Sequence, residues 1–366
     1  MTDLTPAALT PAPNFASDNV SGASPEILEA VVRANAGPAM PYGEDAITKR
    51  LAKLVAEVFE HEVAVFPLAT GSAANALALS ALVPRYGAVY CHREAHVNVD
   101  ECGAPEFFTG GAKLVALDGP HAKIDAGTVA AAVSGAGVVH HVQPAAISIT
   151  QASEQGTVYV PGEVAALAAV AKEHKLALHM DGARFANALA RLGCSPAEAS
   201  WKAGVDVLTL GATKNGALAA EAAIFFKPEQ AAEFPYLRKR GGHLFSKMRF
   251  VSAQLEAYLS DGLWLRNAEH ANAQATRLAE GLAALPGVEV TAPVEANEVF
   301  AALPRTLVEG LQAKGFVFYV WRDEGPADGG APLCRFVTAF DSRPEEVAAL
   351  LAEAARLAGV GAGVGG

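Results

Sequence analysis

Short apolar runs alternate with helical patterns along residues 24–226 of the chain. Ser24 followed by Pro25 predicts the start of a first helix, and helical patterns continue over 44–60 and 162–175. The apolar runs stand at residues 63–69, 88–92, 113–117, 146–150, 176–180, 206–210 and 222–226. Because these runs are apolar on both faces, we expect an α/β fold with a mostly parallel, seven-stranded sheet covered by helices on both sides.

The pattern changes after about residue 250. A helical stretch runs from residue 246 to about residue 285, interrupted mainly by Gly262. Shorter strand patterns with helices between them follow, which is typical of a smaller α+β domain. We expect a flexible arm, a large domain, a small domain and a flexible glycine-rich tail at residues 1–13, 14–255, 256–358 and 359–366, respectively.

Composition narrows the possible classes of function. The chain has 366 residues, 51% of them apolar and 18% charged, and a formal net charge of −11. These values are typical of a globular protein, and the negative charge argues against a nucleic-acid-binding protein. Residues 1–19 show no secretory-signal pattern and no run is long enough to span a membrane, so we expect a cytoplasmic protein. The cysteines are scattered, and we expect small buried apolar residues at positions 91, 102, 194 and 334.

Candidate chemistry follows the predicted strands, because ligands of open α/β sheets bind at the carboxyl ends of the strands. After residues 63–69 comes Thr70-Gly71-Ser72 at the start of a predicted helix. Glycine lets a ligand approach the backbone, and the free N–H groups of a helix start favour a phosphate. The segment has neither the P-loop nor the dinucleotide-binding spacing, and an ordinary helix cap is the alternative.

Two charged residues follow later strands. Asp181 comes directly after the run at 176–180, and Lys214 comes shortly after the run at 206–210. An ion pair between Asp181 and Arg184, or a solvent-facing lysine, would explain each residue alone. A phosphate site, a strand-end carboxylate and a strand-end amine in this order are together the parts that hold pyridoxal 5′-phosphate, which needs an amine for its aldehyde and an acid for its ring nitrogen.

Longer stretches of the chain also match a known family. They are residues 15–22 (FASDNVSG), 42–48 (YGEDAIT), 69–80 (ATGSAANALALS), 94–108, 149–159, 178–194, 206–216 (DVLTLGATKNG) and 246–254. On these motifs the chain resembles the pyridoxal-phosphate-dependent threonine aldolases of the aspartate-aminotransferase fold. The resemblance is strongest to the bacterial low-specificity L-threonine aldolases, which also act on phenylserine.

The resemblance implies roles around the cofactor. Lys214 corresponds to the lysine that forms a Schiff base with pyridoxal 5′-phosphate, and Asp181 corresponds to the carboxylate on the pyridine nitrogen. His96 corresponds to the histidine that stacks on the ring and is a candidate proton acceptor. Gly71 and Ser72 correspond to the phosphate site.

It also implies roles around the substrate. Arg184 corresponds to an arginine near the cofactor's phenolic oxygen and the substrate carboxylate. Ser17 and Arg335 correspond to the pair that binds this carboxylate, with Tyr42 beside them. Lys239 corresponds to a lysine that reaches the phosphate of a neighbouring subunit, and we therefore expect a homodimer or homotetramer with shared active sites.

The chain departs from some relatives at two places. Ala16 replaces an arginine that precedes Ser-Asp in many of them. After the run at 146–150, where some relatives carry Asn-Thr-His, this chain has Thr150-Gln151-Ala152-Ser153 without a histidine. The group that takes the hydroxyl proton is therefore open, and the sequence favours His96 or a water that it orders.

The implied reaction is the cleavage of threonine, allo-threonine or phenylserine-type amino acids into glycine and an aldehyde. Another pyridoxal-phosphate enzyme of the same fold, such as a β-eliminating lyase, an aminotransferase or a racemase, is the main alternative, since fold does not fix function. A non-catalytic binding protein is a further alternative. We expect no metal site, because His92-Arg93-Glu94-Ala95-His96 lacks the zincin spacing. We expect neither a nucleic-acid nor a membrane partner.

Overall fold

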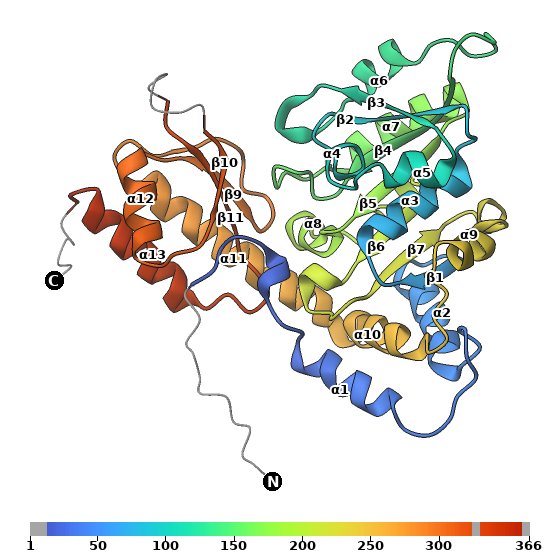
Figure 1. Ribbon diagram of the computed structural model, residues 1–366, viewed down its shortest axis with the longest axis horizontal. Coiled ribbons are helices and arrows are strands. Elements are labelled where there is room, and N and C mark those ends of the chain that lie inside the picture. The colour runs from blue at the N-terminus through green and yellow to red at the C-terminus, as the bar shows by residue number, and fades with distance from the viewer. Residues whose placement is uncertain (1–12, 324–329, 361–366) are drawn as a thin grey trace.

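The chain folds into two lobes joined by a long helix (Figure 1). The computed structural model describes residues 13–323 and 330–360. The arm expected at residues 1–13 and the tail expected at 359–366 fall almost wholly outside these residues.

The larger lobe is built on a seven-stranded sheet in the order β1-β7-β6-β5-β4-β2-β3. Neighbouring strands from β6 to β3 run parallel, while β7 runs antiparallel to both β1 and β6. The strands are β1 (Ala64–Leu68), β2 (Gly87–His92), β3 (Lys113–Leu117), β4 (Gln143–Thr150), β5 (Ala177–Gly182), β6 (Val207–Gly211) and β7 (Glu221–Phe225). Each expected strand is found within a few residues of its predicted bounds, and the mostly parallel α/β fold is confirmed.

Alternate residues of each strand enter different cores. In β5, Leu178 and Met180 join one hydrophobic cluster, whereas His179 and Asp181 point to the opposite face. In β6, Leu208 joins the same cluster as Leu178 and Met180, whereas Val207 belongs to a separate hydrophobic cluster. The strands therefore bury both faces, which explains their nearly continuous apolar runs.

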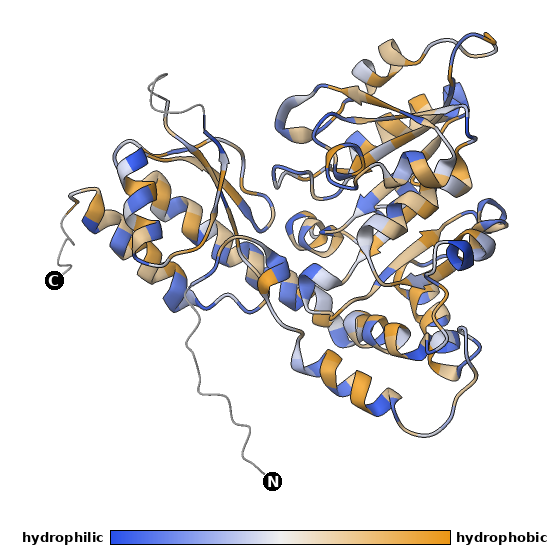
Figure 2. Ribbon diagram, in the orientation of Figure 1, coloured by the Kyte–Doolittle hydropathy of each residue, from blue (hydrophilic) through white to orange (hydrophobic). Residues whose placement is uncertain are grey.

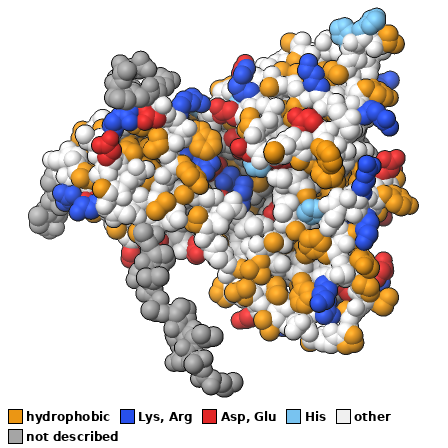
Figure 3. Space-filling view, viewed as in Figure 1, with side chains coloured by type: hydrophobic (Ala, Val, Ile, Leu, Met, Phe, Trp, Pro, Cys, Tyr) orange, Lys and Arg blue, Asp and Glu red, His pale blue; other side chains and the backbone are white. Residues whose placement is uncertain are grey.

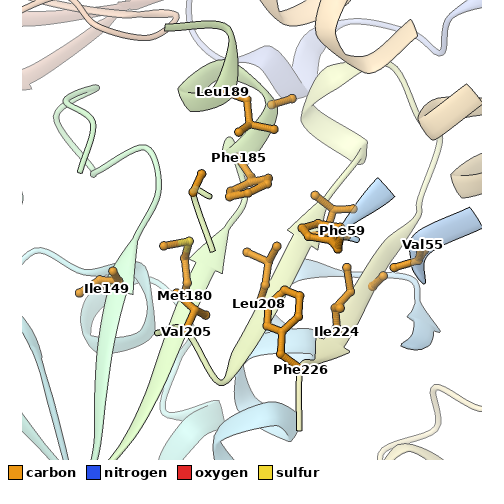
Figure 4. Packing of buried hydrophobic residues seen from close by; sticks show 14 of the residues in the cluster. Val55, Phe59, Ile149, Met180, Phe185, Leu189, Val205, Leu208, Ile224 and Phe226 are labelled. Carbon is orange, nitrogen blue, oxygen red and sulfur yellow. The ribbon is translucent and has the colours of Figure 1, made fainter. Parts of the chain in front are cut away.

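Helices cover both faces of this sheet. They are α1 (Pro25–Ala34), α2 (Ala46–Val58), α3 (Gly71–Leu82), α4 (His96–Val99), α5 (Ala104–Thr109), α6 (Ala126–Ala132), α7 (Pro161–His174), α8 (Phe185–Leu192), α9 (Phe234–Arg240) and α10 (Arg249–Leu259). Side chains of α2, α7, α8 and α10 pack on one face around Phe59, Phe185 and Phe226 (Figure 4). Side chains of α3 and α9 pack on the other face. Figure 2 shows hydrophobic residues gathered along the strands and mixed with polar residues on the outer helices.

The long helical stretch expected at 246–285 is broken into two helices. A short turn, η6 (Ser260–Gly262), separates α10 from α11 (Leu263–Ala283). Asp261 and Gly262 both adopt positive φ there, so Gly262 marks the break that the sequence suggested. Leu263 and Ala268 of α11 still pack with the large sheet.

The smaller lobe has its own sheet, in the order β10-β11-β9-β8, and its own core. Its elements are α11, β8 (Glu289–Val290), β9 (Glu298–Ala302), α12 (Arg305–Ala313), β10 (Tyr319–Arg322), β11 (Leu333–Val337) and α13 (Pro344–Leu357). The expected small α+β domain is therefore found.

The division between the two cores differs from the boundary expected at 255/256. It falls within α11, where Ala268 packs with the large sheet and Ala275 packs with the small one. Phe15 also belongs to the small lobe: its N–H donates to the Val317 carbonyl, and its carbonyl accepts from the Val337 N–H. Hydrophobic periodicity could not reveal this, because an isolated aromatic residue far away in the chain carries no period.

The cysteines only partly follow the expectation. Cys91 and Cys334 are buried, but Cys102 is exposed and Cys194 is intermediate. Cys102 lies in a turn with positive φ at the surface, where its size gives no packing. Among the described residues, no helix combines the length and the apolar composition needed to cross a bilayer.

We expect Phe59→Ala to lower the free energy of unfolding by about 3–5 kcal/mol, because it opens a cavity between Phe185 and Phe226. Urea denaturation of the cofactor-free protein measures this change. Val139→Ala is the control, since Val139 is 92% exposed and its loss should change the value by less than about 0.5 kcal/mol. Equal denaturation midpoints for the two variants would show that Phe59 is not part of the core.

Candidate active site

A cavity of about 250 Å³ lies at the carboxyl ends of β4, β5 and β6. The predicted residues among its lining are Gly71, Ser72, His96, Asp181, Arg184 and Lys214. In the space-filling view, basic side chains and a histidine gather in the hollow between the lobes (Figure 3). The structure thus brings together residues that the sequence placed after four different strands. A larger cavity at the opposite strand ends is lined by seven alanines and eight other residues and contains none of the predicted site residues.

The start of α3 forms one end of the cavity. Thr70 caps this helix, and its hydroxyl accepts a hydrogen bond from the Ala73 N–H at 3.3 Å. The N–H groups of Gly71 and Ser72 belong to the first turn, which has no intrahelical acceptors. A Cβ built on Gly71 would meet no atom within 4 Å, so the backbone faces open space there. This end of the cavity can bind an anion.

Asp181 is held from behind by α3. Its Oδ2 accepts a hydrogen bond from Asn75 Nδ2 at 2.8 Å, and its Oδ1 accepts from the Ala183 N–H at 3.0 Å. Asn75 Oδ1 in turn accepts from the Thr209 hydroxyl at 2.6 Å. The carboxylate is therefore fixed in position and 4% exposed, which is tolerable for a charged group only with such donors.

His96 belongs to the same network. Its Nδ1 lies 2.9 Å from Glu101 Oε1, which also accepts from Asn75 Nδ2 at 2.8 Å. The hydrogen bond to Glu101 raises the pKa of His96 above its usual value, with the charges of Asp181 and Glu154 acting in the same direction. Burial raises the pKa of Glu101. Glu101 and Asn75 therefore hold the imidazole in position at the cavity.

Lys214 lies in a short turn, η4 (Thr213–Asn215), between β6 and β7. The next residue, Asn215, anchors this turn by donating to the Tyr258 hydroxyl at 3.0 Å and the Trp264 carbonyl at 2.8 Å. Gly216 has a φ of +113°, which a side chain rarely adopts. Within residues 13–323 and 330–360, no hydrogen bond or ion pair engages the Lys214 ammonium. The amine is thus placed at the cavity by its neighbours and is available to a ligand.

Arg184 is neutralised within the protein. Its Nε and one terminal nitrogen contact Asp18 at 2.7 and 3.1 Å, and the other terminal nitrogen lies 3.3 Å from Glu298. Burial alone would lower the pKa of Arg184, but the two carboxylates raise it above its usual value. The guanidinium lines the cavity and also joins η1 (Asp18–Val20) to β9 of the small lobe.

Ser17 and Arg335 lie beside the cavity, outside its immediate lining. The Ser17 hydroxyl accepts from the Asn19 N–H at 3.1 Å, and Asn19 lines the cavity. An Arg335 terminal nitrogen donates to the Ala16 carbonyl at 3.2 Å, and its guanidinium lies 4.5 Å from the Trp321 ring centroid. The structure therefore brings Arg335 next to the segment that carries Ser17.

Tyr42 and Lys239 are not part of this cavity. Both are exposed, and the Lys239 ammonium lies 4.8 Å from the centre of the Tyr42 ring. The Tyr42 N–H donates to the Ser246 carbonyl at 3.0 Å, and Tyr42 is not among the residues that line the cavity.

Sequence reasoning missed several residues of the site. Asn75 and Glu101 connect Asp181 with His96, and Glu154 and Glu221 line the cavity. Glu154 follows the strand at 146–150, and ligands of such sheets bind at the carboxyl ends of the strands. The sequence therefore pointed to this segment, but only a histidine was considered there. Glu101 and Glu221 carried no spacing signal.

The side chains present fit pyridoxal 5′-phosphate. The cavity offers an amine without a protein partner at Lys214, a fixed carboxylate at Asp181 and an open helix start at Gly71. These are the groups that an aldehyde, a pyridine nitrogen and a phosphate require. His96 adds a flat ring at the same cavity.

The chain is similar to known proteins over most of its length. A family model described as beta-eliminating lyase matches residues 14–305. The low specificity L-threonine aldolase of Pseudomonas aeruginosa is 46% identical over 333 residues, which cover 91% of this chain and 94% of the relative.

Solved structures show the same fold. A threonine aldolase from Leishmania major superposes with a TM-score of 0.89 at 28% identity, covering 94% of this chain and 99% of the other. An aspartate aminotransferase from Rhodobacter sphaeroides superposes with a TM-score of 0.69 at 19% identity, covering 95% of this chain and 93% of the other. The second similarity concerns the fold alone.

We expect Glu101→Gln to lower the pKa of His96 toward its ordinary value, because the hydrogen bond to Glu101 is the largest cause of its elevation. NMR titration of the imidazole in the cofactor-free protein measures this change. Asp100→Asn removes an exposed neighbouring carboxylate and serves as the control. An unchanged midpoint in Glu101→Gln would show that the pair does not form in solution.

Proposed function

The chain belongs to the beta-eliminating lyase family, and from this membership we propose that it is a pyridoxal-phosphate-dependent aldolase of low specificity. Its substrates are L-threonine, L-allo-threonine and phenylserine-type β-hydroxy-α-amino acids. It cleaves their Cα–Cβ bond to release glycine and an aldehyde. The observation that carries this proposal is the meeting of Lys214, Asp181 and the open start of α3 in one cavity, in a chain 46% identical to a threonine aldolase.

Residues of three elements hold the cofactor. Lys214 would bind its aldehyde carbon, Asp181 would bind its ring nitrogen, and Gly71 and Ser72 would bind its phosphate through the first turn of α3. His96 would lie against the ring, with its position set by Glu101. When bound, the cofactor supplies an electron-withdrawing ring that stabilises negative charge on Cα of the substrate.

The protein's own residues choose which bond of the substrate breaks. A bond on Cα is weakened when it stands perpendicular to the cofactor ring, so the grip on the substrate carboxylate sets the reaction. Arg335 and Ser17 provide this grip from the segment beside the cavity. Because Arg184 is already paired with Asp18 of η1 and Glu298 of β9, its main role is to hold η1 and β9 together.

We assign Tyr42 and Lys239 to the cavity of a neighbouring subunit. They are exposed, they contact each other, and they lie outside the cavity of their own chain. This assignment requires a homodimer or a homotetramer with shared active sites. A cytoplasmic location completes the proposal.

We expect Lys214→Ala to lose both the visible absorbance of the bound cofactor and the release of glycine from L-threonine, because no other amine is assigned to the aldehyde. Absorbance spectra of the purified protein and an assay of glycine measure the two losses. Lys53→Ala is the matched control, since Lys53 lies exposed on α2. A Lys214→Ala protein that keeps the absorbance of the wild type would refute the assignment.

We expect Arg335→Gln to weaken glycine binding by about ten- to a hundredfold, because a charged hydrogen bond contributes about 1.5–3 kcal/mol. The cofactor's absorbance should remain. Spectral titration with glycine gives the dissociation constant, and Arg356→Gln, an exposed arginine on α13, is the control. Unaltered glycine affinity in Arg335→Gln would remove this residue from the substrate site.

A further inference from the structure

Glu154 is a carboxylate that lines the same cavity as Lys214 and Asp181. It follows β4 in a tight turn in which the Ser153 N–H donates to the Thr157 carbonyl and the Gly156 N–H donates to the Ser153 carbonyl. Gly156 has a φ of +73°, and a Cβ there would come within 3.1 Å of Glu298. The backbone that carries Glu154 is therefore fixed against the small lobe.

One oxygen of this carboxylate is engaged and the other is available. Glu154 Oε1 accepts a hydrogen bond from the backbone N–H of His96 at 3.0 Å. In the part of the chain that the structure describes, this is the single hydrogen bond to the carboxyl group. The side chain lines the cavity together with Lys214 and Asp181, so Oε2 can meet a bound substrate.

The surroundings of Glu154 suit a group that gains and loses a proton. Burial raises its pKa to about 7, and the nearby charge of Asp181 acts in the same direction. Lys214, His96 and the His96 N–H act against this shift. An acid–base group works best when its pKa is close to the pH at which the reaction runs.

His96 is less suited to accept a proton. Its Nδ1 is engaged by Glu101, and that hydrogen bond raises the pKa of the imidazole. A ring held in this way is positioned to lie against the cofactor, whereas Glu154 keeps a carboxylate oxygen without a hydrogen bond in the described part of the chain. Another group that lines the same cavity is therefore a better candidate for the proton acceptor, which the sequence left open.

The geometry points to Glu154 as the catalytic residue that accepts the proton of the substrate's β-hydroxyl group. This inference rests on the proposed aldolase function and adds to it the acid–base residue. Glu154 also lies after the strand where a histidine was sought and not found, so a carboxylate supplies the proton acceptor in this chain.

The O–H bond breaks, its proton moves to Glu154 Oε2, and the oxygen electron pair forms the C=O bond of the aldehyde. The Cα–Cβ bond breaks, and its electron pair stays on Cα. Cα then gains a proton, giving glycine, and Glu154 returns its proton to solvent, so no net proton is consumed. In the synthetic direction, the protonated carboxyl group donates to the aldehyde oxygen.

Glu154→Gln tests the inference, because it keeps a carbonyl acceptor for the His96 N–H and removes the proton acceptor. We expect the cofactor absorbance and the glycine dissociation constant to stay within about twofold of wild type. Exchange of the glycine α-proton with deuterium needs no β-hydroxyl, so its rate should also persist. The kcat for L-threonine cleavage should fall by about a hundredfold or more.

Glu221→Gln is the matched control. Glu221 is also buried, its pKa is also raised to about 7, and it also feels the charge of Lys214, but it lies on β7 and its side chain bonds Thr213. If carboxylates acted only through charge on Lys214, both variants would change cleavage and glycine exchange in the same proportion. We expect Glu221→Gln to leave the ratio of the cleavage rate to the glycine-exchange rate unchanged. We expect only Glu154→Gln to lower this ratio.

Two results would overturn the inference. One is Glu154→Gln with wild-type cleavage, and the other is an equal loss of cleavage and of glycine exchange, which would indicate a structural role. Failure of the proposed function is a separate result, since the wild-type protein would then bind the cofactor but release no glycine from threonine.

The pH profile gives a second readout. The free enzyme needs the ionised carboxylate, so kcat/KM for threonine should rise with pH through about 7 and level off above it. The charged groups that face Glu154 are His96 from α4, Asp181 from β5, Lys214 from η4 and Arg184 before α8. Glu154→Gln should lose this rise, whereas Glu221→Gln should keep it. A rise that persists unchanged in Glu154→Gln would contradict the assignment.

Discussion

The hydrogen bond between Asn75 and Asp181 is the interaction on which the cavity depends. A charged carboxylate at a buried strand end is costly unless donors hold it, and here a side chain of α3 supplies the donor. The same amide reaches Glu101, which positions His96. Helix α3 therefore provides the turn that can bind an anion at its start. Through Asn75 in its second turn, it also holds the Asp181 carboxylate and the His96 imidazole.

A second set of charges joins the two lobes. Arg184 lies between Asp18 and Glu298, and Arg335 lies near Glu298 on the adjacent strand. Asp18, Arg184 and Glu298 are buried and Arg335 is partly buried, so removing Arg184 would leave buried carboxylates without their main partner. The segment around Ser17, which we propose to bind the substrate, is thereby held against both lobes, which relates the geometry of the cavity to the packing of the described chain.

The sequence predicted the large sheet well because its strands are buried on both faces, and it predicted Asp181 and Lys214 because each stands where a strand ends. It could not place Phe15 in the small lobe, since a single apolar residue carries no period. Glu154 escaped notice because a carboxylate in a turn normally faces solvent, and only the folded chain shows that this one faces a cavity. The roles proposed for Tyr42 and Lys239 involve a second copy of the chain, and a single sequence shows no pattern for a contact between copies.

The most direct test of the central claim is a crystal structure of the cofactor-loaded enzyme with glycine. The account predicts the cofactor ring nitrogen within hydrogen-bonding distance of Asp181 and its phosphate at the start of α3. It also predicts the glycine carboxylate at Arg335. A cofactor seated with its phosphate away from Gly71, or with its ring nitrogen facing no carboxylate, would contradict the account.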